Sequence, residues 1–150
     1  MTRTITNSIT KEKITRPNPI SIELIYDGKP MLTETDTAGI ITYVNRKFCE
    51  MSGYNKRELL GATHNISRHP DMPSSAFNNM WNVIKKDDEW NGYVKNLHKD
   101  GKFYWVDVYI EPRFNEEGTK IGYIASRRPI STKNLESVEK VYKEMLLEEV

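Results

Sequence analysis

The sequence predicts an α+β domain in which a five-stranded antiparallel sheet carries short helices on one face. Two apolar segments, Met31 to Thr37 and Ile40 to Val44, flank Ala38-Gly39, which is the arrangement of a short β-hairpin. Several short helical segments with cap residues follow. Three further strand-like segments then come in succession, separated by turns at residues 99–102 and 117–118. Such tight turns join strands that pair antiparallel.

Two short helices are expected directly after the first hairpin. Asn45 suits the N-cap of the first helix, because its side chain can accept a hydrogen bond from a free backbone N–H. Gly53 suits the left-handed residue that ends this helix. Asn55 suits the N-cap of the second helix, with Glu58 three residues later as in a capping box.

A longer helix and three strands complete the predicted domain. Pro73 suits the first position of the helix. Four apolar side chains share one of its faces, at positions i, i+3, i+4 and i+7: Phe77, Met80, Trp81 and Ile84. The expected strands are Tyr93 to His98, Phe103 to Ile110 and Ile121 to Arg127.

One face of the middle strand is more uniformly apolar than the other. Every second side chain on that face is expected to point to the interior: Tyr104, Val106, Val108 and Ile110. Trp105 then lies on the outer face of the sheet, where a flanking helix or a second subunit could cover it.

Two flanking segments differ in composition from the domain, which is expected to span residues 21–130. Residues 1–20 are polar, carry four basic residues and one acidic residue, and include Pro17 and Pro19. This composition predicts a mobile N-terminal arm. Residues 131–150 contain no glycine or proline and repeat apolar side chains at helical spacing, which predicts an amphipathic C-terminal helix. We expect this helix to pack near Trp105 and to contribute to self-association.

Composition and charge exclude several function classes. The chain has 22 basic and 21 acidic residues, a net charge of +1, so no strong field favours nucleic acid. The apolar segments are far shorter than the roughly 20 residues of a membrane-spanning helix, and no signal-peptide pattern opens the chain. We therefore expect a cytoplasmic domain with no membrane span, associated with a membrane only through a partner.

The sequence contains no recognisable catalytic or metal-binding pattern. It lacks a nucleophile elbow, a phosphate-binding glycine loop and a set of His, Cys and Asp residues at metal-ligand spacing. Its single cysteine, Cys49, allows no internal disulfide. We therefore expect that the chain is not an enzyme.

The segment His64-Asn-Ile-Ser-Arg68-His69-Pro70-Asp71-Met-Pro73 concentrates polar side chains. It holds two imidazoles, a guanidinium, an amide and a carboxylate within ten residues, ahead of the helix that contains Trp81 and not far from Trp90. So many directional donors and acceptors beside aromatic surface indicate a pocket for a large, polar, partly aromatic ligand. The alternative is a loop whose charges face water.

Several short strings in this order resemble those of a PAS domain: Asn45-Arg-Lys-Phe48, Met51-Ser-Gly53-Tyr54 and Glu58-Leu-Leu-Gly61. The Arg-His-Pro-Asp-Met-Pro string at residues 68–73, together with Trp81, Trp90 and Tyr104-Trp105-Val106, resembles the aerotaxis-receptor branch of that family. The similarity covers residues 31–130. It implies a PAS fold and a redox or oxygen (energy-taxis) sensor that binds FAD noncovalently, forms a homodimer and signals to a chemotaxis transducer or signalling domain.

The resemblance also implies a set of cofactor-binding residues: Asn45, His64, Asn65, Arg68, His69, Asp71, Trp90 and Asn96. The amide of Asn96 offers a donor and an acceptor side by side, which matches the imide edge of a flavin ring. The guanidinium of Arg68 could meet a phosphate oxygen. His69 could bind the ribityl or phosphate region, and the indole of Trp90 could stack on the isoalloxazine or the adenine.

Several alternatives stay open at this point. Asp71 could hold Arg68 or cap the helix that starts at Pro73 instead of contacting ligand, and Asn45 could both cap a helix and serve the flavin. His64 stands near the position where light-sensing relatives carry an adduct-forming cysteine, so no thiol photoadduct is expected.

His64 could instead ligate a haem, or the domain could be a ligand-free interaction module that dimerises. Arg127 and Arg128 end the last strand, where light-sensing relatives carry a flavin-facing glutamine. Whether either arginine reaches the ring is not decided by the sequence.

Overall fold

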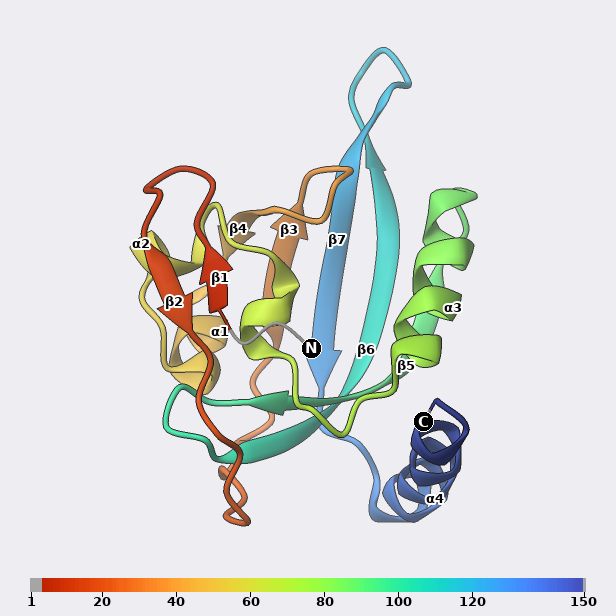
Figure 1. Ribbon diagram of the computed structural model, residues 1–150. Coiled ribbons are helices and arrows are strands. Elements are labelled where there is room, and N and C mark those ends of the chain that lie inside the picture. The colour runs from red at the N-terminus through yellow and green to blue at the C-terminus, as the bar shows by residue number, and fades with distance from the viewer. Residues whose placement is uncertain (1–3, 150) are drawn as a thin grey trace.

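The structure, a computed structural model, describes residues 4–149 (Figure 1). Its strands are β1 (Thr4–Thr6), β2 (Lys13–Thr15), β3 (Met31–Thr35), β4 (Ile41–Val44), β5 (Trp90–Leu97), β6 (Phe103–Phe114) and β7 (Lys120–Arg128). Its helices are α1 (Arg46–Ser52), α2 (Lys56–Leu59), the 3-10 helix η1 (His64–Ser67), α3 (Ser74–Lys85) and α4 (Thr132–Glu148). Within this described part, no helix is both long and apolar enough to cross a membrane.

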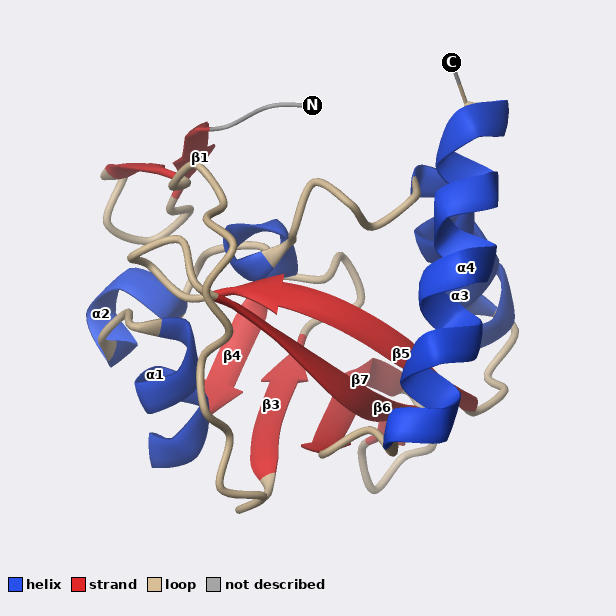
Figure 2. Ribbon diagram, turned by 90° about the horizontal axis from the view of Figure 1, so that it is seen from below, coloured by secondary structure: helices blue, strands red, loops and turns tan. Residues whose placement is uncertain are grey.

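The five-stranded sheet has the order β4-β3-β7-β6-β5, and all neighbouring strands pair antiparallel. The predicted fold class is therefore confirmed. Helices α1 and α2 lie at the β3–β4 end of the sheet, whereas α3 and α4 lie at the β5–β6 end (Figure 2). The last hairpin is longer than expected, because β6 continues to Phe114.

The helix caps predicted from short-range patterns are confirmed. The Oδ1 atom of Asn45 accepts a hydrogen bond from the N–H of Phe48 at 3.0 Å, and Gly53 ends α1 in the left-handed conformation with φ of 80°. Asn55 and Glu58 form both hydrogen bonds of a capping box. These contacts join residues no more than a few positions apart, so the sequence alone can specify them.

The expected mobile arm is instead a hairpin in residues 4–15, in which β1 and β2 pair antiparallel. Asn7 anchors this hairpin to the end of α2, where its Nδ2 atom donates hydrogen bonds to the carbonyls of Leu60 at 2.8 Å and Glu58 at 3.1 Å. Asn7 is fully buried and Ile5 nearly so. A polar composition suggested mobility, but here a buried amide attaches the hairpin to the domain.

Helix α4 packs against the outer face of the sheet through an aromatic pair. The rings of Tyr142 and Trp105 are stacked with centroids 6.1 Å apart, and the Tyr142 hydroxyl donates a hydrogen bond to the carbonyl of Tyr93 at 2.7 Å. Ser131 caps the helix by accepting from the N–H of Asn134. The prediction that a helix covers Trp105 is confirmed, and the covering helix belongs to the same chain.

Candidate functional site

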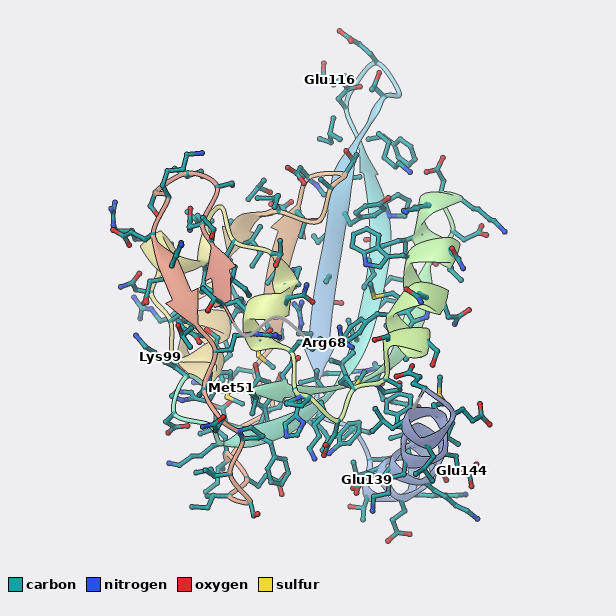
Figure 3. The ribbon with its side chains drawn as sticks, in the orientation of Figure 1. Met51, Arg68, Lys99, Glu116, Glu139 and Glu144 are labelled. Carbon is teal, nitrogen blue, oxygen red and sulfur yellow. The ribbon has the colours of Figure 1, made fainter. Side chains whose placement is uncertain are left out.

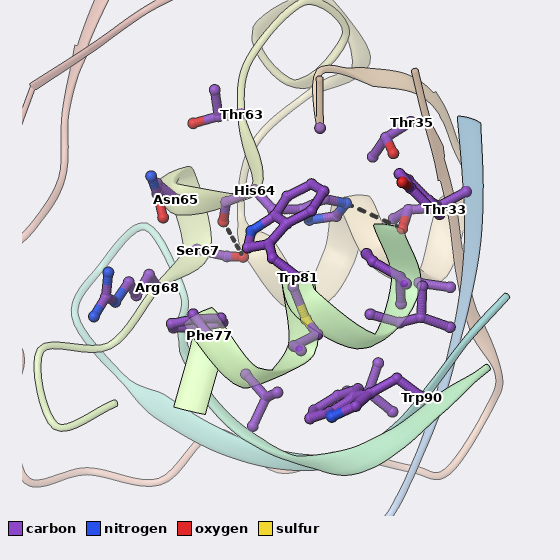
Figure 4. A pocket seen from close by; sticks show the side chains of 18 of the residues that line it. Thr33, Thr35, Thr63, His64, Asn65, Ser67, Arg68, Phe77, Trp81 and Trp90 are labelled. Carbon is purple, nitrogen blue, oxygen red and sulfur yellow. Dashed lines mark hydrogen bonds between the residues drawn. The ribbon is translucent and has the colours of Figure 1, made fainter. Parts of the chain in front are cut away.

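A cavity of about 490 Å³ lies between the concave face of the sheet and the helices η1 and α3 (Figure 4). Its volume falls within the range of small-molecule binding sites. The lining side chains come from β3, η1, α3, β5, β6 and β7, so segments from across the domain meet here. Within residues 4–149, no three His, Cys, Asp or Glu side chains come together as a metal site.

The apolar stripe of α3 forms one wall of this cavity. Four side chains share that wall: Phe77, Met80, Trp81 and Ile84. Trp81, which helical spacing placed in the core, is only half-buried and meets the ring of Tyr123 edge-on at 5.9 Å between centroids.

The strand side of the cavity is also largely apolar. Val94, Val108 and Ile110 contribute to it from β5 and β6, and Trp90 lies at the start of β5. The indole of Trp90 lies over Gly92, where a Cβ atom would collide with the ring. The glycine therefore makes room for the tryptophan. The α3 side and the strand side of the cavity are both apolar, which suits a planar aromatic ligand.

A buried polar corner closes the cavity beside β3 and β7. The Oγ1 atom of Thr33 accepts a hydrogen bond from Nη1 of Arg127 at 3.0 Å and lies 3.3 Å from Nε2 of His64. The guanidinium of Arg127 also lies 4.9 Å from the centre of the Phe48 ring. All three polar side chains line the cavity.

Burial determines the protonation of this corner. Burial and the nearby charge of Arg127 lower the pKa of His64 to about 3, so its imidazole is neutral at neutral pH. Burial also lowers the pKa of Arg127, to about 10, which leaves the guanidinium charged. The corner therefore contains one fixed positive charge.

The alternation of side chains along β7 decides which terminal arginine reaches the cavity. Tyr123, Ala125 and Arg127 point inward and line it. Arg128 points outward, and its Nε atom forms an ion pair with Asp107 at 3.1 Å. Of these two arginines, Arg127 lines the cavity and Arg128 does not.

Arg68 and Asn96 meet at the opposite junction, where the chain leaving η1 passes β5. Their backbones form an isolated antiparallel bridge, and both residues line the cavity. Nη2 of Arg68 donates to the carbonyl of Met72 at 2.9 Å and to Oγ of Ser74 at 3.2 Å, while the guanidinium lies 4.6 Å from the centre of the Phe77 ring. Figure 3 shows Arg68 near the middle of the molecule.

One donor of Arg68 is unsatisfied. Its Nε atom is buried and has no hydrogen-bond partner among the described residues. Burial lowers the pKa of Arg68, and the carboxylate of Glu149 partly opposes this shift. A buried N–H without a partner costs free energy, so the position favours a ligand that brings an acceptor.

Five of the eight predicted cofactor-binding residues share this cavity: His64, Asn65, Arg68, Trp90 and Asn96. Asn45 does not line it, since its Oδ1 atom caps α1 and its Nδ2 atom donates to the carbonyl of Pro30 at 3.0 Å. Cys49, on α1, also lies outside the cavity lining.

His69 and Asp71 are also outside the cavity lining. The Nδ1 atom of His69 accepts from the N–H of Asp71 at 2.9 Å, and burial lowers the pKa of this imidazole to about 4. Asp71 is exposed and forms an ion pair with Lys95 at 3.0 Å. Neither alternative for Asp71 is seen, since it does not bind Arg68 and provides no cap at Pro73, which is itself the N-cap of α3.

Sequence reasoning missed several cavity residues: Thr33, Thr35, Phe77 and Trp81. The two threonines do carry a signal, because they occupy alternate positions of β3 together with the buried Met31. A polar residue on the buried face of a strand indicates a polar partner or a ligand. The partner itself, Arg127, is distant in sequence and could not be identified from it.

Comparison with known proteins places the chain in a family. The family described as "PAS fold" matches residues 41–127. The aerotaxis receptor of Escherichia coli strain K12 is 40% identical over 117 residues, which cover 78% of this chain and 23% of the receptor. The nitrogen fixation regulatory protein of Klebsiella pneumoniae is 29% identical over 119 residues, covering 79% of this chain and 24% of that protein. The chain thus spans about a quarter of the length of these relatives.

Solved structures agree on the fold. The light state of the blue-light photoreceptor Aureochrome1 LOV matches with a TM-score of 0.63 and 20% identity, over 79% of this chain and 90% of that chain. A structure concerning a flavin analogue in a light-oxygen-voltage domain matches with a TM-score of 0.64 and 18% identity, over 79% of this chain and 88% of that chain.

Proposed function

The chain belongs to the PAS family of sensor domains, and from this premise we propose that it binds FAD noncovalently and reports the redox state of the flavin to a signalling partner. The observation that carries the proposal is the cavity itself. It combines two facing apolar walls with buried polar groups at its margins, which suits a flat heteroaromatic ring with a polar tail. The similarity to a protein named aerotaxis receptor supports a role in energy taxis, with a chemotaxis transducer as the partner.

The lining residues fit such a cofactor. Asn96 is buried and lines the cavity, and its amide carries the donor and acceptor that the imide edge of the ring requires. The unsatisfied Nε of Arg68 offers an N–H to an oxygen of the ribityl or phosphate chain. Trp81 and Trp90 supply aromatic surface for the ring system.

FAD would supply a ring that accepts and returns electrons, while the protein binds, orients and shields it. When the charge and hydrogen bonding of the ring change, the polar groups around it must form new pairs. An unpaired buried amide costs about 1–3 kcal/mol, which is enough to change a two-state equilibrium by about tenfold or more.

A chain of contacts connects the cavity to α4, which we propose as the output element. Arg68 binds Oγ of Ser74 in the first turn of α3, and the backbone N–H of Ser74 donates to the carboxylate of Glu149 at the end of α4. The aromatic pair Trp105–Tyr142 connects α4 to the strands independently. A shift of Arg68 would therefore alter how firmly α4 is held.

Spectroscopy of the purified protein tests the proposal directly. We expect an oxidised-flavin absorption spectrum, and acid should release a ligand whose mass is that of FAD. FMN in its place would overturn the dinucleotide assignment, and a Soret band would favour haem on His64. A colourless protein that takes up no added FAD would favour a ligand-free interaction module. Faster hydrogen exchange of α4 backbone amides after reduction would support the output role.

A further inference from the structure

The buried corner of the cavity has an electrostatic character that binding of a neutral ring does not explain. Arg127 is 7% exposed, yet no carboxylate among residues 4–149 forms an ion pair with it. Two other arginines of the sheet differ, since Arg128 pairs with Asp107 and Arg113 pairs with Glu34. A buried charge without a counter-ion destabilises a fold unless something else compensates it.

We infer that Arg127, held by Thr33, forms an anion-recognition site inside the cavity that binds the reduced, negatively charged flavin ring in preference to the oxidised ring. This role, which rests on the function proposed above, assigns the missing counter-ion to the ligand. It makes Arg127 a determinant of the redox potential rather than of flavin binding alone.

The orientation of the guanidinium supports this assignment. A guanidinium has five N–H donors, and the structure shows one hydrogen bond from it within the described residues, from Nη1 to Thr33. The Phe48 ring packs 4.9 Å from the guanidinium carbon. The remaining donors can therefore serve a group in the cavity that Arg127 lines.

The groups around Arg127 leave it as the fixed cation of this corner. His64 faces the same Thr33 hydroxyl but is neutral, because burial keeps its pKa near 3. Tyr104 and Tyr26 also lie near enough to influence the pKa of Arg127. Burial raises the pKa of both phenols, so neither becomes an anion at neutral pH.

The chemistry of the ring supplies the charge that this corner lacks. The oxidised isoalloxazine is neutral, and two electrons from an external reductant plus one proton from solvent leave it with one net negative charge. A fixed cation in a buried site stabilises that anion more than the neutral ring. The other lining arginine, Arg68, already donates to Met72 and Ser74 and lies in the field of Glu149.

A comparison of oxidised and reduced flavin affinities tests the inference. Dissociation constants for FAD and for dithionite-reduced FAD are measured anaerobically with the full chain and with Arg127→Gln. We expect the variant to weaken binding of the reduced form at least tenfold more than binding of the oxidised form. A tenfold difference lowers the potential of a two-electron couple by about 30 mV.

Three matched variants make the result specific. Arg127→Lys keeps the charge and should retain most of the preference, whereas Thr33→Val removes the oxygen that holds Nη1 and should lose part of it. Arg128→Gln, one residue along and outside the cavity, should leave both affinities unchanged. In Arg127→Gln the pKa of the reduced ring should rise, because no nearby cation then stabilises its anionic form.

The outcomes separate this inference from the function on which it rests. Flavin bound by every variant with one unchanged potential would overturn the anion site and leave the flavin sensor intact. A wild-type chain that binds no flavin would overturn both. If Arg127→Gln fails to fold, an unchanged potential in Thr33→Val would still refute the role of this corner.

Discussion

The carboxylate of Glu149, at the end of α4, accepts hydrogen bonds from the backbone N–H of Ser75 at 2.8 Å and from its hydroxyl at 2.9 Å. Ser75 lies in the first turn of α3, whose N-cap residue Pro73 provides no side-chain cap. The free N–H groups at this helix start are therefore satisfied by a residue from the last helix of the chain. Two helices that are far apart in sequence are joined end to end beside the cavity.

Glu149→Gln should loosen α4 and reduce the dependence of its docking on pH. The hydrogen bonds from Ser75 and Ser74 lower the pKa of Glu149 below its ordinary value of 4.5. The stabilisation that these hydrogen bonds give to the docking of α4 is therefore fully present above pH 4.5. It is lost as the pH falls through the lowered pKa of Glu149. Limited proteolysis of α4 between neutral and acidic pH measures the effect, and equal pH profiles for both proteins would contradict it.

Tyr142→Phe should remove one hydrogen bond, to the carbonyl of Tyr93, and lower the free energy of unfolding by about 1 kcal/mol. Tyr142→Ala should also uncover Trp105 to acrylamide while leaving flavin bound. Leu147→Ala is the control, since this side chain on the same helix is 75% exposed.

Deleting α4 should in addition change the oligomeric state. Unchanged quenching and unchanged mass in solution would show that α4 has neither role.

Arg68→Ala should lower flavin occupancy more than it lowers stability, because Arg68 lines the cavity with an unsatisfied Nε. Arg68→Lys should restore flavin occupancy only partly, since an ammonium lacks the planar fork of donors of a guanidinium. Asp71→Asn is the control, as Asp71 lies outside the cavity and pairs with Lys95. Flavin content is measured by the ratio of visible to protein absorbance. Equal losses in the Arg68 and Asp71 variants would place the tail of the ligand elsewhere.

Asn96→Ala should retain some flavin but alter its potential and rate of reduction. The buried amide of Asn96 lies on the cavity wall, and under the proposed function its removal would leave one edge of the ring without its donor and acceptor. Anaerobic titration with dithionite gives both quantities. Asn91→Ala on the same strand serves as the control, since Asn91 binds Asp107 and the carbonyl of Val108 and does not itself line the cavity. Identical titrations would mean that Asn96 does not contact the ring.

Asn7→Ala should destabilise the domain by about 1–3 kcal/mol, because it leaves the carbonyls of Glu58 and Leu60 without their donor. Urea unfolding monitored by tryptophan fluorescence measures this loss of stability. Flavin affinity should not change, since Asn7 does not line the cavity. Thr10→Ala tests the hairpin turn alone. A loss of stability below that of Thr10→Ala would indicate that the hairpin is not an integral part of the domain.

The local features that the sequence predicted correctly depend on neighbours within the chain. The caps at Asn45 and Asn55 act over three residues, and Gly53 needs only its own backbone conformation. The features that it missed join distant segments: Arg127 meets Thr33 across 94 residues, and Glu149 meets Ser75 across 74. No periodicity within a helix or strand contains that information.

The cavity residues fall into the same two groups. The polar string at residues 64–73 correctly indicated a pocket, because donors and acceptors cluster there in the sequence itself. It could not show that His69 and Asp71 lie outside the cavity lining while Arg68 lines it. Which members of a polar cluster face inward depends on a turn geometry that residue types do not fix.

Because the apolar stripe of α3 borders a cavity of about 490 Å³, part of the folding free energy belongs to whatever fills that cavity. A ligand that binds the folded chain alone stabilises it by mass action, by about 2.7 kcal/mol at a concentration one hundred times its dissociation constant. Chains made when ligand is scarce would then unfold more often and be degraded faster. The amount of this protein in a cell would follow the supply of its ligand.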